Sequence, residues 1–332
     1  MTQLDWGPAV ELLRDAGEVT LACHVSPDGD ALGSMLGFGL ALRARGARVV
    51  ASYGDEPFAV PRTLAFLPGQ ELLVPPARFP AAPELMVTFD TGSLDRLGTL
   101  GEPAKAARRL LVVDHHASNT RFGTVHLLDP AAAATAVLVA KLLDRLGVAL
   151  TPDVATALYT GLATDTGSFK FAATTPAVHR LAARLLGTGF RHDLVSRAVF
   201  DTASFGYLRV LGTVLRDARL ELDAVGGLGL VWTVVEAAPR RACGVGMDEI
   251  EGVIDVLRRA TEAEVAAVLK EGDDGTVQVS TRSKGRIDLS VVCRALGGGG
   301  HRYAAGYTSS VGPTETVERL RAELAGAPHL EA

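Results

Sequence analysis

Three short apolar runs in the first half of the chain each stop at a histidine or an aspartate. The runs and the residues that end them are 19–23 and His24, 85–89 and Asp90, and 110–113 and Asp114. Stretches of helical length separate such runs, for example residues 30–45, which precede a further β-rich run at 48–53. Strands that alternate with helices favour a mostly parallel sheet with helices on both faces. The sequence therefore predicts an α/β domain.

The pattern changes after a helical region at about residues 176–218, which follows a short strand signal at 169–171. Beyond it the strand candidates are 220–222, 228–235, 264–270 and 277–281, with a helix expected at 248–259. Turn residues such as Asp273-Asp274-Gly275 favour antiparallel pairs, so we expect a smaller, mixed α/β domain. A length of 332 residues suits about two domains at roughly 150 residues each. We place them at 1–190 and 219–332, joined by a helical connector at 191–218.

Composition excludes several classes of protein. The net charge of −5 argues against a strongly basic nucleic-acid coat, although a local basic patch remains compatible with it. The three cysteines are far apart and form no CxxC pair, which argues against a disulfide framework and favours a reducing compartment. No window reaches about 18 uncharged apolar residues, and the charged N-terminal residues lack a secretory core. We therefore expect a cytoplasmic protein without a membrane span.

Further polar residues belong with those at the strand ends. The segment after the first run contains Asp28 and Asp30, two histidines (His115 and His116) follow Asp114, and Asp165 is expected at a helix end. Taken singly, each has an ordinary explanation as a cap, a turn or a core residue. Because the carboxyl ends of parallel strands share one edge of a sheet, all of these segments are expected to converge there.

Crowded carboxylates repel one another unless a cation compensates them. Mixed aspartate and histidine ligation suits Mn²⁺ or a similar first-row ion, and the absence of clustered cysteines weakens a structural zinc site. Up to six ligands for two ions would fit a two-metal phosphoester hydrolase.

The second half holds a basic cluster within an acidic chain. Residues 276–307 contain five Lys or Arg against one acid, Asp288. Four consecutive glycines at 297–300 precede His301, and such a run lets backbone N–H groups approach an anion. The alternative is a flexible glycine loop beside a solvated strand.

Five motifs together resemble those of the DHH phosphoesterase family. They are HVSPDGDALGS from His24, DTG from Asp90, VDHH from Val113, GLATDTGSF from Gly161 and GGGGHRYAAG from Gly297. The last one is similar to the signature of the DHH-associated domain. The resemblance covers nearly the whole chain and is closest to the NrnA-type branch of nanoRNases and 3′,5′-bisphosphate nucleotide (pAp) phosphatases.

The resemblance implies a role for each matching residue. Two Mn²⁺ ions, with Mg²⁺ or Co²⁺ as substitutes, would be held by His24, Asp28, Asp30, Asp90, His115 and Asp165, with Asp90 bridging. Asp114 would orient a histidine, and His116 would contact the scissile phosphate or protonate the leaving oxygen. The substrate would be bound in the second domain by Arg282, Ser283, Gly298, Gly299, Gly300 and His301.

The implied function is hydrolysis of short oligonucleotides to nucleoside monophosphates and of pAp to AMP and phosphate, by a homodimer. Three alternatives stay open at this point. Two are enzymes: a RecJ-like single-strand exonuclease, and a phosphodiesterase for cyclic dinucleotides or pApA. The third is a non-catalytic nucleotide-binding sensor, which the loss of a ligand would favour; all six ligand positions are filled.

Overall fold

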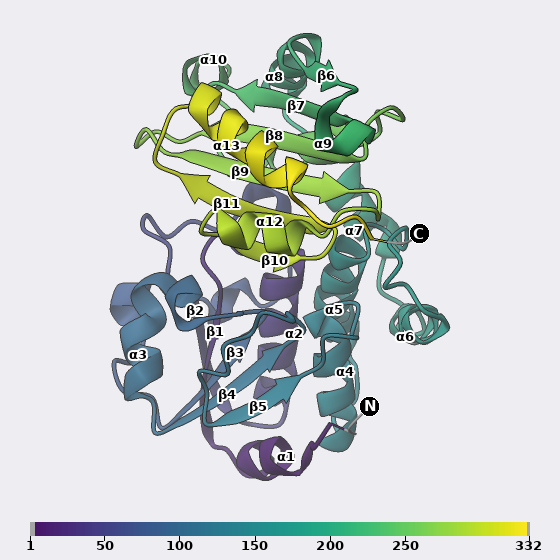
Figure 1. Cartoon of the computed structure of the whole chain (residues 1–332). Coiled ribbons are helices and arrows are strands. Elements are labelled where there is room, and N and C mark those ends of the chain that lie inside the picture. The colour runs from purple at the N-terminus through teal and green to yellow at the C-terminus, as the bar shows by residue number, and fades with distance from the viewer. Residues whose placement is uncertain (1–3, 331–332) are drawn as a thin grey trace. The chain divides into compact units, whose positions relative to one another are not determined.

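The structure is a computed structural model that describes residues 4–330, and it forms two compact units, Met1–Thr202 and Ala203–Ala332 (Figure 1). The break falls inside the segment expected as the helical connector. Helix α7 (His192–Phe200) belongs to the first unit, and α8 (Phe205–Arg216) begins the second. Each unit has its own sheet and its own core.

The first unit is built on a five-stranded parallel sheet in the order β2-β1-β3-β4-β5. Its strands are β1 (Glu18–Cys23), β2 (Arg48–Tyr53), β3 (Leu85–Phe89), β4 (Arg109–Asp114) and β5 (Val125–Leu128). The predicted parallel α/β fold is confirmed, and so are the first four strands. The short strand β5 was not predicted.

Both faces of this sheet are covered, as parallel sheets require. Side chains alternate between the faces, so that Leu111 and Val113 of β4 join one apolar cluster while Leu110 and Val112 join another. The helices of the unit are α1 (Gly7–Arg14), α2 (Gly29–Ala44), α3 (Gly101–Ala106), α4 (Thr135–Arg145), α5 (Pro152–Asp165), α6 (Pro176–Leu186) and α7. Helix α2 is buried almost all round, which fits its apolar sequence.

Glycines let α2 and α5 approach each other closely. A Cβ on Gly33 would lie 2.4 Å from the carbonyl oxygen of Ala157, and a Cβ on Gly161 would lie 2.6 Å from Oδ1 of Asp30. Thr151 caps α5, because its hydroxyl accepts the N–H of Val154. The close approach brings Asp30 of α2 beside α5, the helix that ends at Asp165.

The second unit contains a six-stranded mixed sheet in the order β10-β11-β9-β8-β7-β6, in which only β7 and β8 pair in parallel. Its strands are β6 (Arg219–Glu221), β7 (Leu230–Val235), β8 (Val265–Glu271), β9 (Val277–Ser283), β10 (Gly299–His301) and β11 (Ala304–Ser309). Its helices are α8, α9 (Ala224–Gly227), α10 (Ala237–Ala242), α11 (Val253–Leu257), α12 (Leu289–Ala295) and α13 (Pro313–Ala325). The predicted mixed α/β character is confirmed.

Two local expectations were wrong. Residues 169–171 form a turn and not a strand, because Ser168 and Phe169 adopt positive φ values of 59° and 65°. The helix expected at 248–259 is shorter and broken, with a 3₁₀ turn at Asp248–Ile250 before α11. Within residues 4–330, no helix is both long enough and apolar enough to span a lipid bilayer.

Candidate metal centre

The polar residues predicted at the strand ends gather in the first unit. His24 directly follows β1, Asp90 follows β3, and Asp114 is the last residue of β4. Asp28 is the N-cap of α2, and Asp165 is the last residue of α5. The fold therefore collects these side chains at the carboxyl edge of the sheet, where ligands bind in open α/β folds.

His24 lies among two carboxylates. Its Nε2 is 3.9 Å from Oδ1 of Asp28 and 3.6 Å from Oδ2 of Asp90. The histidine and Asp90 are buried, whereas the Asp28 side chain is 55% exposed. One face of this group is therefore open to a ligand from solvent.

His115 lies among three carboxylates. Its Nε2 is 3.0 Å from Oδ2 of Asp165, 3.4 Å from Oδ1 of Asp90 and 3.9 Å from Oδ2 of Asp30. Asp90 thus presents one oxygen to His24 and the other to His115. It is the carboxylate that the two groups share.

The tautomers of both histidines suit metal binding. The Nδ1 atom of His24 is 2.8 Å from the carbonyl oxygen of Val25, and that of His115 is 3.1 Å from the carbonyl oxygen of Ala132. A carbonyl oxygen accepts only, so these contacts place a proton on each Nδ1. The Nδ1 atom of His24 also lies 3.4 Å from Nη2 of Arg96, which only donates, and the contact with the carbonyl oxygen is the shorter of the two. Loss of the second proton would therefore free the lone pair of Nε2, the atom that faces the carboxylates, as metal binding requires. A hydrogen bond at Nδ1 commonly orients a metal-binding histidine in this way.

Burial disfavours the charged forms of the side chains in this cluster. Burial raises the pKa of Asp30 well above its usual range, and the neighbouring carboxylates of Asp90 and Asp165 raise it further. Burial also raises the pKa of Asp165 to about 6, although the hydrogen bond from His115 opposes it. Burial acts against the charged form of His115 too, but its hydrogen bonds to Asp165 and Asp90 raise its pKa well above the ordinary value.

The donor set fits divalent cations. Several groups of three side chains in this unit place one ligand atom each within 4.8 Å of one another, and two of them contain the expected ligands: His24, Asp28 and Asp90, and Asp30, His115 and Asp165. Imidazole nitrogens with carboxylate oxygens suit first-row divalent ions, and the positive charge would offset the burial of several carboxylates. All six side chains expected as ligands are therefore brought together.

The Asp114 carboxylate contacts the ring of the second histidine of its motif. Its Oδ1 lies 2.7 Å from Nδ1 of His116 and accepts the backbone N–H groups of His115 and His116 at 2.8 and 3.2 Å. Burial lowers the pKa of His116, but the hydrogen bond to Asp114 dominates and raises it to about 9. Asp114 therefore orients His116.

Asn119 was missed by the sequence reasoning. Its side-chain amide donates to Oδ2 of Asp114 at 2.6 Å and to the carbonyl oxygen of Thr91 at 3.0 Å. It thus anchors the carboxylate that orients His116. The only signal for it in the sequence was its place three residues after the histidine pair, inside DHHASN.

In the second unit, two expected substrate residues share one face of the sheet. Ala304 of β11 pairs with His301 of β10 on one side and with Arg282 of β9 on the other. Directly paired residues point to the same face, so the imidazole and the guanidinium lie on one row, about two strand spacings or roughly 10 Å apart. Such a row can bind an extended anion.

Ser283 points to the opposite face, because successive residues of a strand alternate. It is buried, and its hydroxyl donates to Oε1 of Glu264 at 2.7 Å and accepts the N–H of Gly285 at 3.1 Å. These contacts hold the turn after β9. They do not support the predicted contact of Ser283 with substrate, which stays a prediction.

The glycine run also has a packing reason. A Cβ on Gly298 would lie 2.1 Å from the carbonyl oxygen of Gly306, and one on Gly300 would lie 2.7 Å from that of Ala304. Gly300 moreover has a φ of 133°, which L side chains rarely adopt. Close pairing of β10 with β11 therefore requires glycine at both positions, whether or not Gly299 and its neighbours bind an anion.

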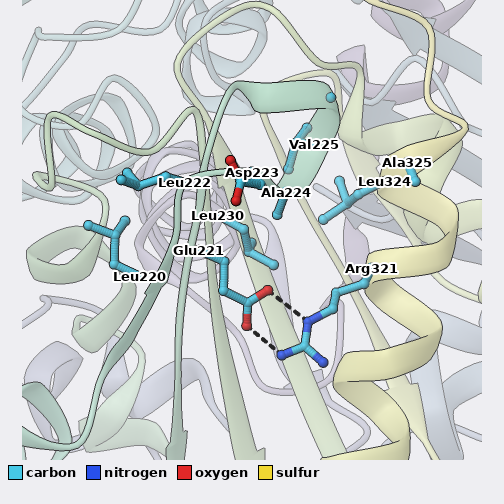
Figure 2. A pocket seen from close by; sticks show the side chains of 11 residues that line it. Leu220, Glu221, Leu222, Asp223, Ala224, Val225, Leu230, Arg321, Leu324 and Ala325 are labelled. Carbon is cyan, nitrogen blue, oxygen red and sulfur yellow. Dashed lines mark hydrogen bonds and ion pairs between the residues drawn. The ribbon is translucent and has the colours of Figure 1, made fainter.

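A separate pocket of about 700 Å³ opens beside β6 in the second unit (Figure 2). Its polar floor is an ion pair in which Arg321 donates to both carboxylate oxygens of Glu221. Glu221 also accepts the indole N–H of Trp232 at 2.6 Å. The charges of Glu221 and Arg321 compensate each other, which leaves Asp223 as the other charged residue of the lining, and we do not place a site there.

Comparison with known proteins agrees with the motifs. Residues 18–162 match the N-terminal domain of the DHH family, and residues 236–327 match the DHHA1 domain. The bifunctional oligoribonuclease and PAP phosphatase NrnA of Thermus thermophilus is 36% identical over 320 residues, which is 95% of this chain and 92% of that protein.

Two solved structures have a similar fold. An exopolyphosphatase-related protein from Bacteroides fragilis aligns with a TM-score of 0.86 at 23% identity, over 98% of each chain. RecJ from Thermus thermophilus, solved in complex with Mn²⁺, aligns with a TM-score of 0.55 at 16% identity, over 98% of this chain and 55% of RecJ. Together with the matched domains and the similarity to NrnA, these findings show that the chain belongs to the DHH family.

Proposed function

We propose that this chain is a metal-dependent phosphoesterase that hydrolyses short oligonucleotides to nucleoside monophosphates and pAp to AMP and phosphate. The observation that carries the proposal is the position of Asp90, whose two oxygens face His24 and His115 respectively. The name of the Thermus thermophilus relative, an oligoribonuclease and PAP phosphatase at 36% identity, supports this substrate class.

In this proposal the centre holds two Mn²⁺ ions, for which Mg²⁺ or Co²⁺ can substitute. One ion would be held by His24, Asp28 and Asp90, and the other by Asp30, Asp90, His115 and Asp165. When bound, such ions supply a water nucleophile at neutral pH and neutralise the charge that develops on the phosphoryl group.

His116 is assigned to the scissile phosphate or to the leaving oxygen. Asp114 holds its Nδ1 at 2.7 Å, which fixes the plane of the ring and makes Nε2 the atom that would donate to substrate. Asn119 holds Asp114 in turn. A general acid needs such orientation, because proton transfer requires hydrogen-bond reach and alignment.

We assign substrate binding to the second unit, through Arg282 and His301 on one face of its sheet and the glycine run that leads into β10. The chain would then divide into a catalytic domain at 1–190, a helical connector at 191–218 and a DHH-associated substrate-binding domain at 219–332. The family resemblance also leads us to propose a homodimer, which light scattering of the purified protein would test.

A substrate panel in Mn²⁺ tests the proposal. It contains pAp, a dinucleotide, a 24-mer, a cyclic dinucleotide and pyrophosphate, each followed by product release. We expect AMP and phosphate from pAp and mononucleotides from the dinucleotide. The matched control is an Asp90→Asn preparation purified in parallel, since a contaminating nuclease would act equally in both. Turnover of none of the nucleotide substrates above that control would refute the proposal and favour a sensor.

Length preference is a separate prediction. The rate per chain end should fall by about tenfold or more from the dinucleotide to the 24-mer, because a long single strand needs a stacking platform of aromatic side chains. Aromatics make up only 5% of this chain, and its second half holds one basic cluster, at residues 276–307. Equal or faster cleavage of the 24-mer would instead favour a RecJ-like exonuclease.

A further inference from the structure

We propose that Thr135 is a positioning residue, which fixes Asp30 and Asp90 in the orientation that binds the metal ions. The inference rests on the metal centre of the proposed function. Thr135 is the first residue of α4 and is fully buried. It follows a run of alanines and belongs to none of the motifs that the sequence analysis singled out.

Thr135 contacts two carboxylates of the centre. Its backbone N–H donates to Oδ2 of Asp30 at 2.5 Å, and its hydroxyl donates to Oδ1 of Asp90 at 2.9 Å. The next N–H of the helix, from Ala136, donates to Oδ1 of Asp30 at 2.9 Å, and the Ser34 hydroxyl donates to the same oxygen at 3.1 Å. A single residue thus links the shared carboxylate to a carboxylate of the His115 group.

The two backbone contacts break no hydrogen bond within α4. The first N–H groups of a helix have no partner within it, so those of Thr135 and Ala136 are available to Asp30. They are directed at a fully buried carboxylate, whose charge they help to stabilise. The contacts therefore keep Asp30 in place against the repulsion of the other carboxylates.

The hydroxyl contact selects which lone pairs of Asp90 remain for metal. An ionised carboxylate has about four lone-pair sites, and a hydroxyl bond to Oδ1 occupies one of them. The bond also fixes the rotation of the carboxylate plane, on which the division of its two oxygens between His24 and His115 depends. Residues that orient a ligand in this way tune metal affinity without touching the metal.

An ordinary buried threonine in the same unit behaves differently. The hydroxyl of Thr160, which is also fully buried, donates to the backbone carbonyl oxygen of Thr156 at 2.8 Å within α5. This is the usual local bond of a helical threonine. Thr160→Val is therefore a matched control, because it removes a buried hydroxyl without removing a contact to a carboxylate.

The experiment measures Mn²⁺ binding to the metal-free full chain by titration calorimetry. Thr135→Val keeps the size of the side chain and the backbone N–H but removes the hydroxyl, so Mn²⁺ affinity should fall by about tenfold or more. Thr135→Ser restores the hydroxyl and should bind close to the parent, as should Thr160→Val. In limiting Mn²⁺, Thr135→Val should lower kcat on the dinucleotide and leave KM unchanged, because Thr135 is assigned no contact with substrate.

The outcomes separate this inference from the proposed function. If the parent binds Mn²⁺ and Thr135→Val binds it equally well, Thr135 is only structural and the inference fails alone. If the parent binds no divalent ion, the metal centre and the inference fail together. Should Thr135→Val not fold, Thr135→Ala takes its place, since it also lacks the hydroxyl and adds no bulk; parent-like affinity in that variant overturns the inference in the same way.

Discussion

Asp90→Asn should lower kcat/KM on every substrate by at least about a thousandfold, which corresponds to about 4 kcal/mol of lost transition-state stabilisation. Asparagine matches aspartate in size but has a single oxygen, so it cannot offer one to each of the groups of His24 and His115. It also lacks the negative charge that two cations need between them. The measurement is steady-state hydrolysis of pAp and of a dinucleotide in Mn²⁺.

Asparagine is a better test than alanine because of the backbone. Asp90 has a φ of 54°, in the left-handed region that asparagine tolerates and alanine does not favour. Asp90→Ala should also be inactive, but part of its effect would be strain of about 1–2 kcal/mol. Asp153→Asn, an exposed carboxylate on α5, is the matched control and should keep parental activity. A folded Asp90→Asn protein with more than a tenth of parental activity would contradict the shared role.

The position of the site could be predicted from the order of the strands and helices alone. Residues that follow parallel strands meet at one edge of the sheet, whatever their distance in sequence. His24 and Asp90 meet for that reason, and Asp165 joins them because α5 ends there. The finer partners could not be predicted. Thr135 and Asn119 act through single hydrogen bonds that depend on how α4 and a loop pack, and neither stands at a strand end.

The second sheet was harder to predict than the first. Strand β10 consists of Gly299–His301, residues without β propensity, and it forms only because Gly298 and Gly300 let it pair closely with β11. A glycine run in the sequence predicts a loop, and only tertiary pairing reveals a strand. Ser283 shows the same limit, since its direction depends on the register of β9 and not on the motif around it.

His301→Ala should lower kcat/KM on nucleotide substrates by about ten- to a hundredfold, as expected for one lost hydrogen bond to a phosphate of roughly 1–3 kcal/mol. The metal content should stay unchanged, because all six proposed ligands lie in the first unit. Two measurements are needed: bound Mn²⁺ by elemental analysis, and kcat/KM on a dinucleotide and on pAp. His329→Ala removes an exposed histidine of the same unit and is the matched control.

The row formed by His301, Ala304 and Arg282 allows a sharper version of this test. If the imidazole and the guanidinium bind one substrate, the two groups are coupled. The double variant Arg282→Gln/His301→Ala should then change the activation free energy, measured from kcat/KM, by an amount different from the sum of the two single changes. Additive effects would mean that they act on separate substrates or separate steps. Loss of metal from His301→Ala would contradict the division of labour between the units. If His301→Ala keeps parental activity, the glycine run has a packing role alone. The phosphate-binding residues would then lie elsewhere in the chain.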